Sequence, residues 1–171
     1  KGIENAIHEL SPLKIMVHYF FFNKYDDESF LFNCEKALKA GLDGLIIATV
    51  LGKAAKKFIS CIPIDLPYVF FDSFVPGANP LTVIGQDSLR AGRLAASLMC
   101  LLLPTGGELA IIRSLPWDYH IEQRVNGFLG YFNKKKLYSV KVYDIKNYKN
   151  GILLGNVISQ IKHNHTDLKG L

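Results

Sequence analysis

Two carboxylates placed just after predicted strands could grip a small hydroxylated molecule. Asp72 ends the apolar run 68–71, and Asp87 follows the run 82–86 directly before a long helical pattern. Open parallel sheets bind their ligands beyond the carboxyl ends of the strands, so we expect both side chains at such an edge. Each also has a purely structural explanation. Asp87 suits the N-cap of a helix, and Asp72 could initiate the turn that follows it.

Arg124 is a third candidate, because it lies one turn into a predicted helix. Trp117, Asp118 and His120 stand just before it and add an aromatic ring and polar groups. Proteins hold sugars with planar charged or amide side chains that hydrogen-bond adjacent hydroxyls, and with aromatic rings that stack on the apolar face. An ion pair of Arg124 with Glu122 or Asp118, and plain packing of Trp117, are the alternatives that the sequence leaves open.

Signatures of catalysis are missing from the sequence. It has no nucleophile elbow, no zinc-ligand spacing and no dinucleotide fingerprint, and Gly52-Lys53 lacks the flanking residues of a phosphate loop. We interpret His163 and His165 as solvated residues at a helix end rather than as metal ligands. The sequence therefore predicts a binding protein without a metal or cofactor. A flavodoxin-like or other doubly wound enzyme would need an early glycine-rich phosphate loop, and none is visible.

Composition is that of a globular protein. The 171 residues are 49% apolar and carry a net charge of +5, with lysines scattered along the chain apart from the run 134–136, which we interpret as a solvated helix end. Cys34, Cys61 and Cys100 form no metal spacing and cannot all pair within one chain, which favours a reducing compartment. No apolar run approaches the roughly 18 to 20 residues of a membrane span.

Helices alternate with short apolar strands along the chain, as in parallel α/β proteins. We predict helices at 1–10, 27–40, 53–62, 88–103, 120–135 and 150–163, and strands at 13–22, 43–49, 67–71, 81–85, 108–113 and 139–143. In the helix 88–103, the helical spacing indicates a buried face made of Ala91, Leu94, Ala95, Leu98 and Leu102. The breaker segment 104–107 predicts a crossing between two lobes, 1–104 and 105–171.

Five segments along the chain resemble segments of known sugar-binding proteins and occur in the same order. The stretch 83–96, in which Asp87 precedes a helix with Gly92 near its start, is similar to a segment of LacI/GalR-type transcription regulators and of ribose-type periplasmic binding proteins. Gln123-Arg-Val-Asn-Gly-Phe128 resembles their Arg-x-x-Gly-Phe segment. The stretches 1–6, 40–47 and 66–72 add supporting matches.

The resemblance implies a two-lobed α/β fold of the periplasmic-binding-protein-like type I class, incomplete here because family members have a strand before the first helix and further strands after residue 171. Asp87 and Arg124 would then grip the ligand. Asp72, His120, Asp118 and Trp117 would be weaker contributors.

By the same resemblance, we expect the sugar-sensing effector domain of a cytoplasmic LacI-type regulator, which is not an enzyme or a membrane protein. Such a regulator is a homodimer that binds DNA through a helix-turn-helix upstream of this sequence. The alternative is a periplasmic sugar-binding protein of a transport system. The unpaired cysteines and the Pro76-Gly77 loop favour the regulator.

Overall fold

The computed structural model describes residues 2–114, 118–133, 135–145, 151–165 and 167–171, with the backbone alone at 151–154. The chain divides into two compact units, residues 1–42 and 43–171. The smaller unit is helical where it is regular, and the larger unit contains two parallel sheets. The predicted α/β class with parallel sheets and flanking helices is confirmed.

The smaller unit contains helix α1 (Gly2–Glu9), a 3-10 turn at Ser11–Leu13 and helix α2 (Asp27–Lys39). Helix α2 begins where the sequence predicts, because Oδ1 of Asp26 accepts hydrogen bonds from the backbone N–H groups of Glu28 and Ser29 at 3.0 and 3.2 Å. Just beyond its other end, Gly41 adopts a left-handed φ of 63°. The predicted helix is thus confirmed at both ends.

The strand predicted at 13–22 is wrong. Residues 15–23 have no strand pairing among the described residues, and two of their apolar side chains are largely exposed, Met16 at 84% and Phe21 at 83%. Aromatic contacts form locally instead, with the Phe22 ring packed edge-to-face on Phe30 at 4.8 Å between centroids. A nearly continuous apolar run has no period that identifies a strand, and a strand also needs a neighbour to complete its hydrogen bonds.

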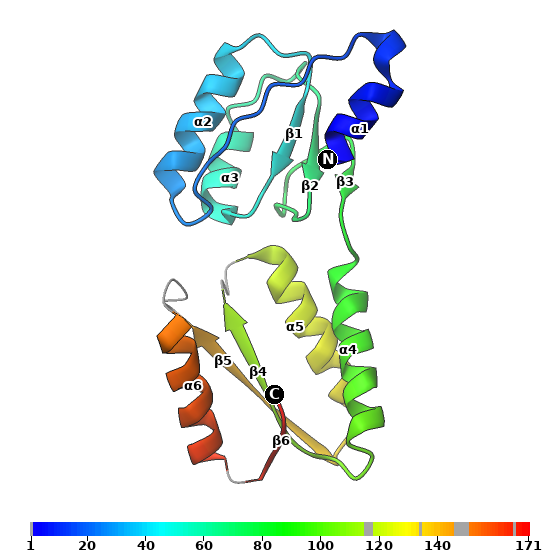
Figure 1. Cartoon of the computed structure of the whole chain (residues 1–171), viewed down its shortest axis with the longest axis vertical. Coiled ribbons are helices and arrows are strands. Elements are labelled where there is room, and N and C mark those ends of the chain that lie inside the picture. The colour runs from blue at the N-terminus through cyan, green and yellow to red at the C-terminus, as the bar shows by residue number, and fades with distance from the viewer. Residues whose placement is uncertain (1, 115–117, 134, 146–150, 166) are drawn as a thin grey trace. The chain divides into compact units, whose positions relative to one another are not determined.

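The first sheet of the larger unit is parallel, with the order β1-β2-β3. Its strands are β1 (Leu45–Ala48), β2 (Tyr68–Phe71) and β3 (Val83–Ile84), and helix α3 (Gly52–Ile59) links the first two (Figure 1). Helix α3 contributes buried Ala55 and Phe58, and Phe70 is the fully buried centre of the sheet. Because the strands are parallel, their carboxyl ends share one edge, and Asp72 and Asp87 follow at that edge.

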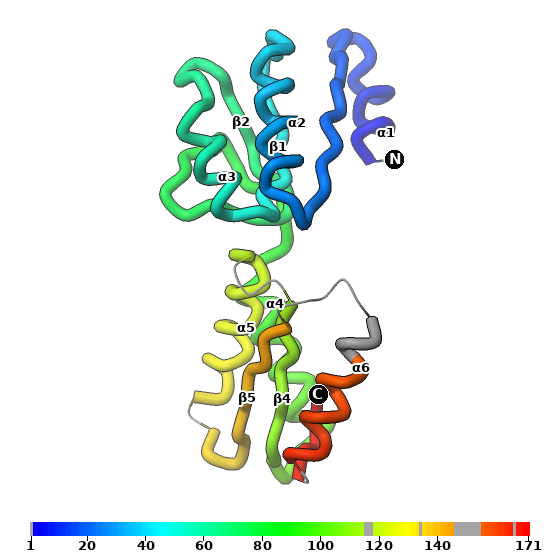
Figure 2. The backbone as a smooth tube through the Cα atoms, turned by 90° about the vertical axis from the view of Figure 1, so that its left-hand side faces the viewer, coloured from blue at the N-terminus to red at the C-terminus, as the bar shows by residue number. Residues whose placement is uncertain are grey.

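The second sheet has the order β5-β4-β6 and is also parallel. It is formed by β4 (Gly107–Ser114), β5 (Tyr138–Ile145) and β6 (Leu168–Gly170), with helices α4 (Ser88–Leu102), α5 (Tyr119–Phe132) and α6 (Gly151–Asn164). Helix α6 lies on the opposite side of this sheet from α4 (Figures 1 and 2). The sequence did not predict β6, which has three residues and, in the described part of the chain, pairs with Glu108 and Leu109 of β4.

Helix α4 has the predicted bounds but not the predicted buried face. Leu94, Leu98 and Leu102 are exposed at 62%, 51% and 73%, whereas Gly92 and Ala96 are buried. The leucine stripe and the small-residue stripe both follow the helical period, so periodicity alone could not choose between them. Close contact with α5 decides in favour of the small residues.

The main core of the second sheet joins α4, β4 and α5. Ala96, Leu109 and Phe132 are its buried centre, and Met99 and Phe128 pack against them. The predicted boundary near residue 104 stays a prediction. Among the described residues, no helix combines the length and apolar character needed to cross a bilayer.

Candidate ligand-binding site

A pocket of about 380 Å³ lies at the carboxyl edge of the first sheet. Its lining comes from three stretches, the segment after β2 (72–74), the end of β3 with the start of α4 (within 83–89), and the start of α5 (within 119–123). The volume is near the lower end of the roughly 300 to 1,000 Å³ of small-molecule sites. Asp72, Asp87 and His120, three of the predicted site residues, line this pocket.

Asp72 reaches the pocket from a constrained backbone. Its φ is 70°, a left-handed value that aspartate tolerates better than most residues, and its backbone N–H donates to the carbonyl of Ile84 at 2.8 Å. This hydrogen bond extends the pairing of β2 with β3 by one residue. The end of the sheet therefore fixes where the Asp72 carboxylate leaves the chain.

Asp87 both caps α4 and lines the pocket. Its Oδ1 accepts a hydrogen bond from the backbone N–H of Arg90 at 2.9 Å, and its Oδ2 lies 3.8 Å from Arg90 Nε. The side chain remains 58% exposed, and an exposed ion pair at that distance contributes little stability. The cap explanation is thus correct, and it leaves one carboxylate oxygen available to a ligand.

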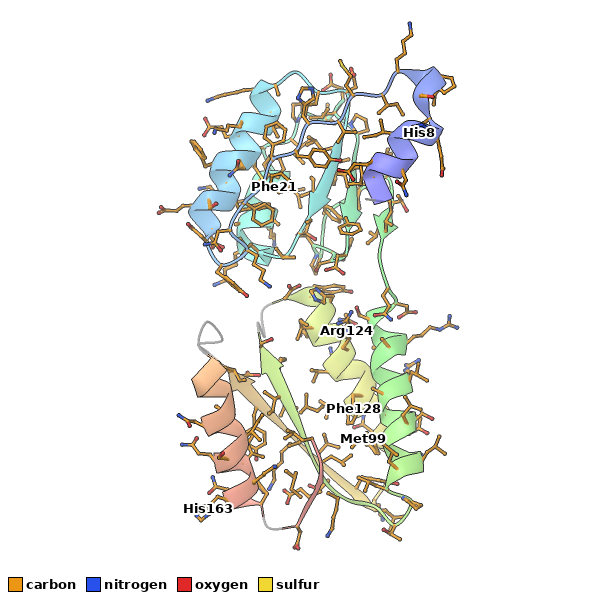
Figure 3. All side chains as sticks on the ribbon, in the orientation of Figure 1. His8, Phe21, Met99, Arg124, Phe128 and His163 are labelled. Atoms are coloured by element: carbon orange, nitrogen blue, oxygen red, sulfur yellow. The ribbon has the colours of Figure 1, made fainter. Side chains whose placement is uncertain are left out.

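Arg124 pairs with a residue that the sequence analysis did not single out. Its Nη2 donates to Oε1 of Gln86 at 3.1 Å, and its Nε is buried without a hydrogen-bond partner in the described part of the chain. Arg124 lines a second, mainly apolar pocket between α4, α5 and β4, and Gln86 lines the first. Arg124 and Phe128 lie one turn apart on α5, beside α4 (Figure 3).

A buried polar contact joins the segment after β2 to the start of α5. Asp118 is 1% exposed and its Oδ1 accepts a hydrogen bond from Ser73 Oγ at 3.1 Å. Nδ1 of His120 lies 2.8 Å from the same oxygen, without the angle of a hydrogen bond. Burial raises the pKa of the Asp118 carboxyl, and the contacts with His120 and Ser73 oppose that rise. Nothing in the sequence pattern points to Ser73.

Aromatic rings form one part of the pocket wall. Phe74 and Tyr119 both line it and contact each other edge-to-face, with 5.5 Å between ring centroids. The sequence predicted an aromatic contribution from the start of α5, and Phe74 was missed because it lies in a turn-rich loop. Trp117 lies outside the described residues.

Two glycines of the family-like segments bring α4 and α5 into backbone contact. A Cβ added to Gly92 would lie 2.0 Å from the carbonyl oxygen of Arg124, and one added to Gly127 would lie 2.1 Å from that of Leu89. Only glycine fits such a crossing. Because Asp87 and Arg124 each lie within five residues of it, the crossing sets the positions of both.

The sequence matches the periplasmic binding protein domain family over residues 1–161. The chain belongs to this family. A search of curated proteins gave no significant match. The membership confirms the fold that the resemblance implied, since periplasmic-binding-protein-like domains have parallel sheets flanked by helices.

Solved structures with the fold of this periplasmic binding protein domain include a putative regulator and several transport proteins. One is a putative LacI transcriptional regulator from Bacteroides fragilis, with a TM-score of 0.86, 23% identity, and coverage of 99% of this chain and 61% of that chain. An ABC transporter solute binding protein from Mycobacterium smegmatis with bound glycerol has a TM-score of 0.82, 18% identity, and coverage of 98% and 58%. One from Burkholderia graminis in complex with D-arabinose has a TM-score of 0.71, 21% identity, and coverage of 85% and 51%.

This periplasmic binding protein domain thus spans about half to three fifths of the length of these structures. At identities below 25% the likeness establishes the fold alone. The role and the ligand of each solved structure are properties of that structure alone.

The described residues of the domain contain no cluster of three metal-ligating side chains. His165, predicted to be solvated, is instead only 15% exposed. Its Nδ1 lies 3.0 Å from Glu108 Oε1, and its Nε2 contacts the Tyr143 hydroxyl. These contacts join β4 and β5 to the residue that follows α6, so His165 is explained by packing.

Proposed function

We propose that this domain binds a sugar effector in the pocket at the carboxyl edge of the first sheet, as the sensing domain of a LacI-type transcription regulator. The observation that carries the proposal is the lining of that pocket. Carboxylates of Asp72 and Asp87, amides of Gln86 and Gln123, and the Phe74 ring surround one space of about 380 Å³. This combination suits a polyol.

Each side chain has a distinct role in the proposal. Asp72 and Asp87 accept hydrogen bonds from adjacent hydroxyls, and the Phe74 ring packs on the apolar face of the sugar. Arg124 acts through the Gln86 amide, which its Nη2 already orients. Asp118 acts from behind His120, because its side chain is buried.

Three features support a regulator over a transport protein. One solved structure similar over 99% of this chain is a putative LacI regulator, the Pro76-Gly77 loop resembles the regulators, and the described cysteines are free. On this proposal the full protein is a cytoplasmic homodimer without enzymatic activity, and the sugar changes how an upstream helix-turn-helix contacts DNA. A periplasmic sugar-binding protein of a transport system is the second candidate, supported by the transport proteins of the same fold.

A thermal-shift screen of mono- and disaccharides on the purified protein tests the proposal. A ligand should raise the melting temperature of the wild type and should lose most of that effect in Asp87→Asn and Arg124→Met. Asparagine caps helices as well as aspartate does, so the first variant keeps α4 intact. Asp65→Asn, at an exposed loop position away from the pocket, is the matched control. Unchanged shifts in both Asp87→Asn and Arg124→Met would remove these residues from the proposed site.

The gene context separates the two candidates. A helix-turn-helix upstream, with operator DNA binding that responds to the sugar, supports the regulator. A secretory leader, together with sugar uptake that is lost on deletion, supports the transport protein.

A further inference from the structure

We infer that the pocket selects uncharged or amine-bearing sugars and rejects sugar acids and sugar phosphates. The inference rests on the proposed function and adds the chemical class of the ligand. Its starting point is the charge of the lining, where Asp72 and Asp87 both contribute carboxylates and no lysine or arginine appears among the described lining residues.

Two arginines contact lining residues without lining the pocket themselves. Arg124 donates from Nη2 to the Gln86 amide, and Arg90 lies at 3.8 Å from Asp87 on the exposed side of α4. Gln86 therefore presents an amide to the pocket where a guanidinium would otherwise attract an anion. Among the described lining residues, the ligand meets the amides, the two carboxylates and the imidazole of His120, whose Nδ1 lies 2.8 Å from the Asp118 carboxylate.

Helix ends do not supply the missing positive charge. Helices α4 and α5 both begin at the pocket, and a free helix N-terminus favours anions. The chain itself places Asp87 at the first of these ends, where its Oδ1 occupies the Arg90 N–H, and Asp118 at the second. The partial positive charge of each helix end is therefore offset by a carboxylate of the chain.

An anionic substituent in this pocket would approach two like charges. Repulsion of this kind weakens with water and salt but does not change sign. We expect a sugar acid or phosphate to bind at least tenfold more weakly than its neutral parent. An amino sugar should bind as well as the parent or better, with an advantage that shrinks as salt is raised.

The test is isothermal titration at neutral pH with stereochemically matched sets. Each set contains one neutral hexose and its 2-amino, uronate, 1-phosphate and 6-phosphate derivatives. The acidic groups lie at both ends of the sugar ring. If one of them projects out of the pocket into solvent, the other still tests the repulsion. The expected result is binding of a neutral member or its amine, with at least tenfold weaker binding of all three acidic derivatives.

The double variant Asp72→Asn/Asp87→Asn tests the cause. Asparagine tolerates the left-handed backbone at position 72 and caps α4 at position 87, so the change removes charge and keeps the fold. Discrimination against the acidic derivatives should fall at least tenfold in this variant. Acidic derivatives that bind the wild type as tightly as their neutral parent, or discrimination unchanged in the double variant, overturn the inference and leave sugar binding standing. No binding by any member of any set removes the proposed function, and the inference falls with it.

Discussion

Replacing Gly92 by alanine should separate α4 from α5. The added Cβ would lie 2.0 Å from the carbonyl oxygen of Arg124, about 1.4 Å short of the 3.4 Å at which ordinary contact begins, and the neighbouring atoms are backbone that cannot rotate away. Overpacking typically costs about 1 to 3 kcal/mol, and a rigid backbone neighbour places this case near the upper end. Alanine recovers about 1 kcal/mol of helix propensity. The net loss of unfolding free energy is about 2 kcal/mol.

Gly130→Ala is the matched control for this change. Gly130 lies in the same helix pair, within α5, and a Cβ there meets nothing within 4 Å. It should gain up to about 1 kcal/mol from helix propensity alone. At about 2 to 4 °C per kcal/mol for a chain of this size, the two variants should melt about 10 °C apart, as measured by circular dichroism at 222 nm.

Ligand binding adds a second readout to the same pair. Gly92→Ala should also weaken sugar binding, because the backbone that must move is that of Arg124, whereas Gly130→Ala should leave it unchanged. If Gly92→Ala melts together with Gly130→Ala, α4 and α5 are not in backbone contact and the explanation of the two motif glycines is wrong.

Two further predictions concern buried titratable groups. Burial raises the pKa of Asp118, so ionising this carboxyl destabilises the fold. The destabilisation is absent below the ordinary pKa and grows as pH rises through the raised pKa. Asp118→Asn cannot ionise, and its melting temperature relative to the wild type should therefore rise between pH 3.5 and pH 7; a constant difference would contradict this. Burial also raises the pKa of Cys34 to about 12, so iodoacetamide at neutral pH should alkylate exposed Cys61 and leave Cys34 unmodified until the protein is denatured, as mass spectrometry would show.

Local signals made much of the fold predictable. The helical pattern at 27–40 and the apolar runs of β1, β2 and β4 each depend on a few neighbouring residues, and the structure has these elements close to where the sequence placed them. The strand predicted at 13–22 failed because an apolar run does not reveal whether it has a neighbour to pair with. Three-residue β6 is too short to leave any pattern.

The site was predictable only in part. Asp72, Asp87 and His120 line the pocket because strand ends and helix starts are readable positions. Ser73 and Gln86 were missed because their partners, Asp118 and Arg124, lie 45 and 38 residues away in the chain. The same limitation hid the true inner face of α4, which depends on α5 rather than on α4 itself.

The left-handed backbone of Asp72 has a consequence for directed evolution. Glycine adopts that conformation without the cost of roughly 1 to 2 kcal/mol that a Cβ adds, so a library selected only for heat resistance should be enriched in Asp72→Gly. The winners would have lost one of the two acids facing the pocket. Selection for robustness and selection for sensing therefore pull this single position in opposite directions.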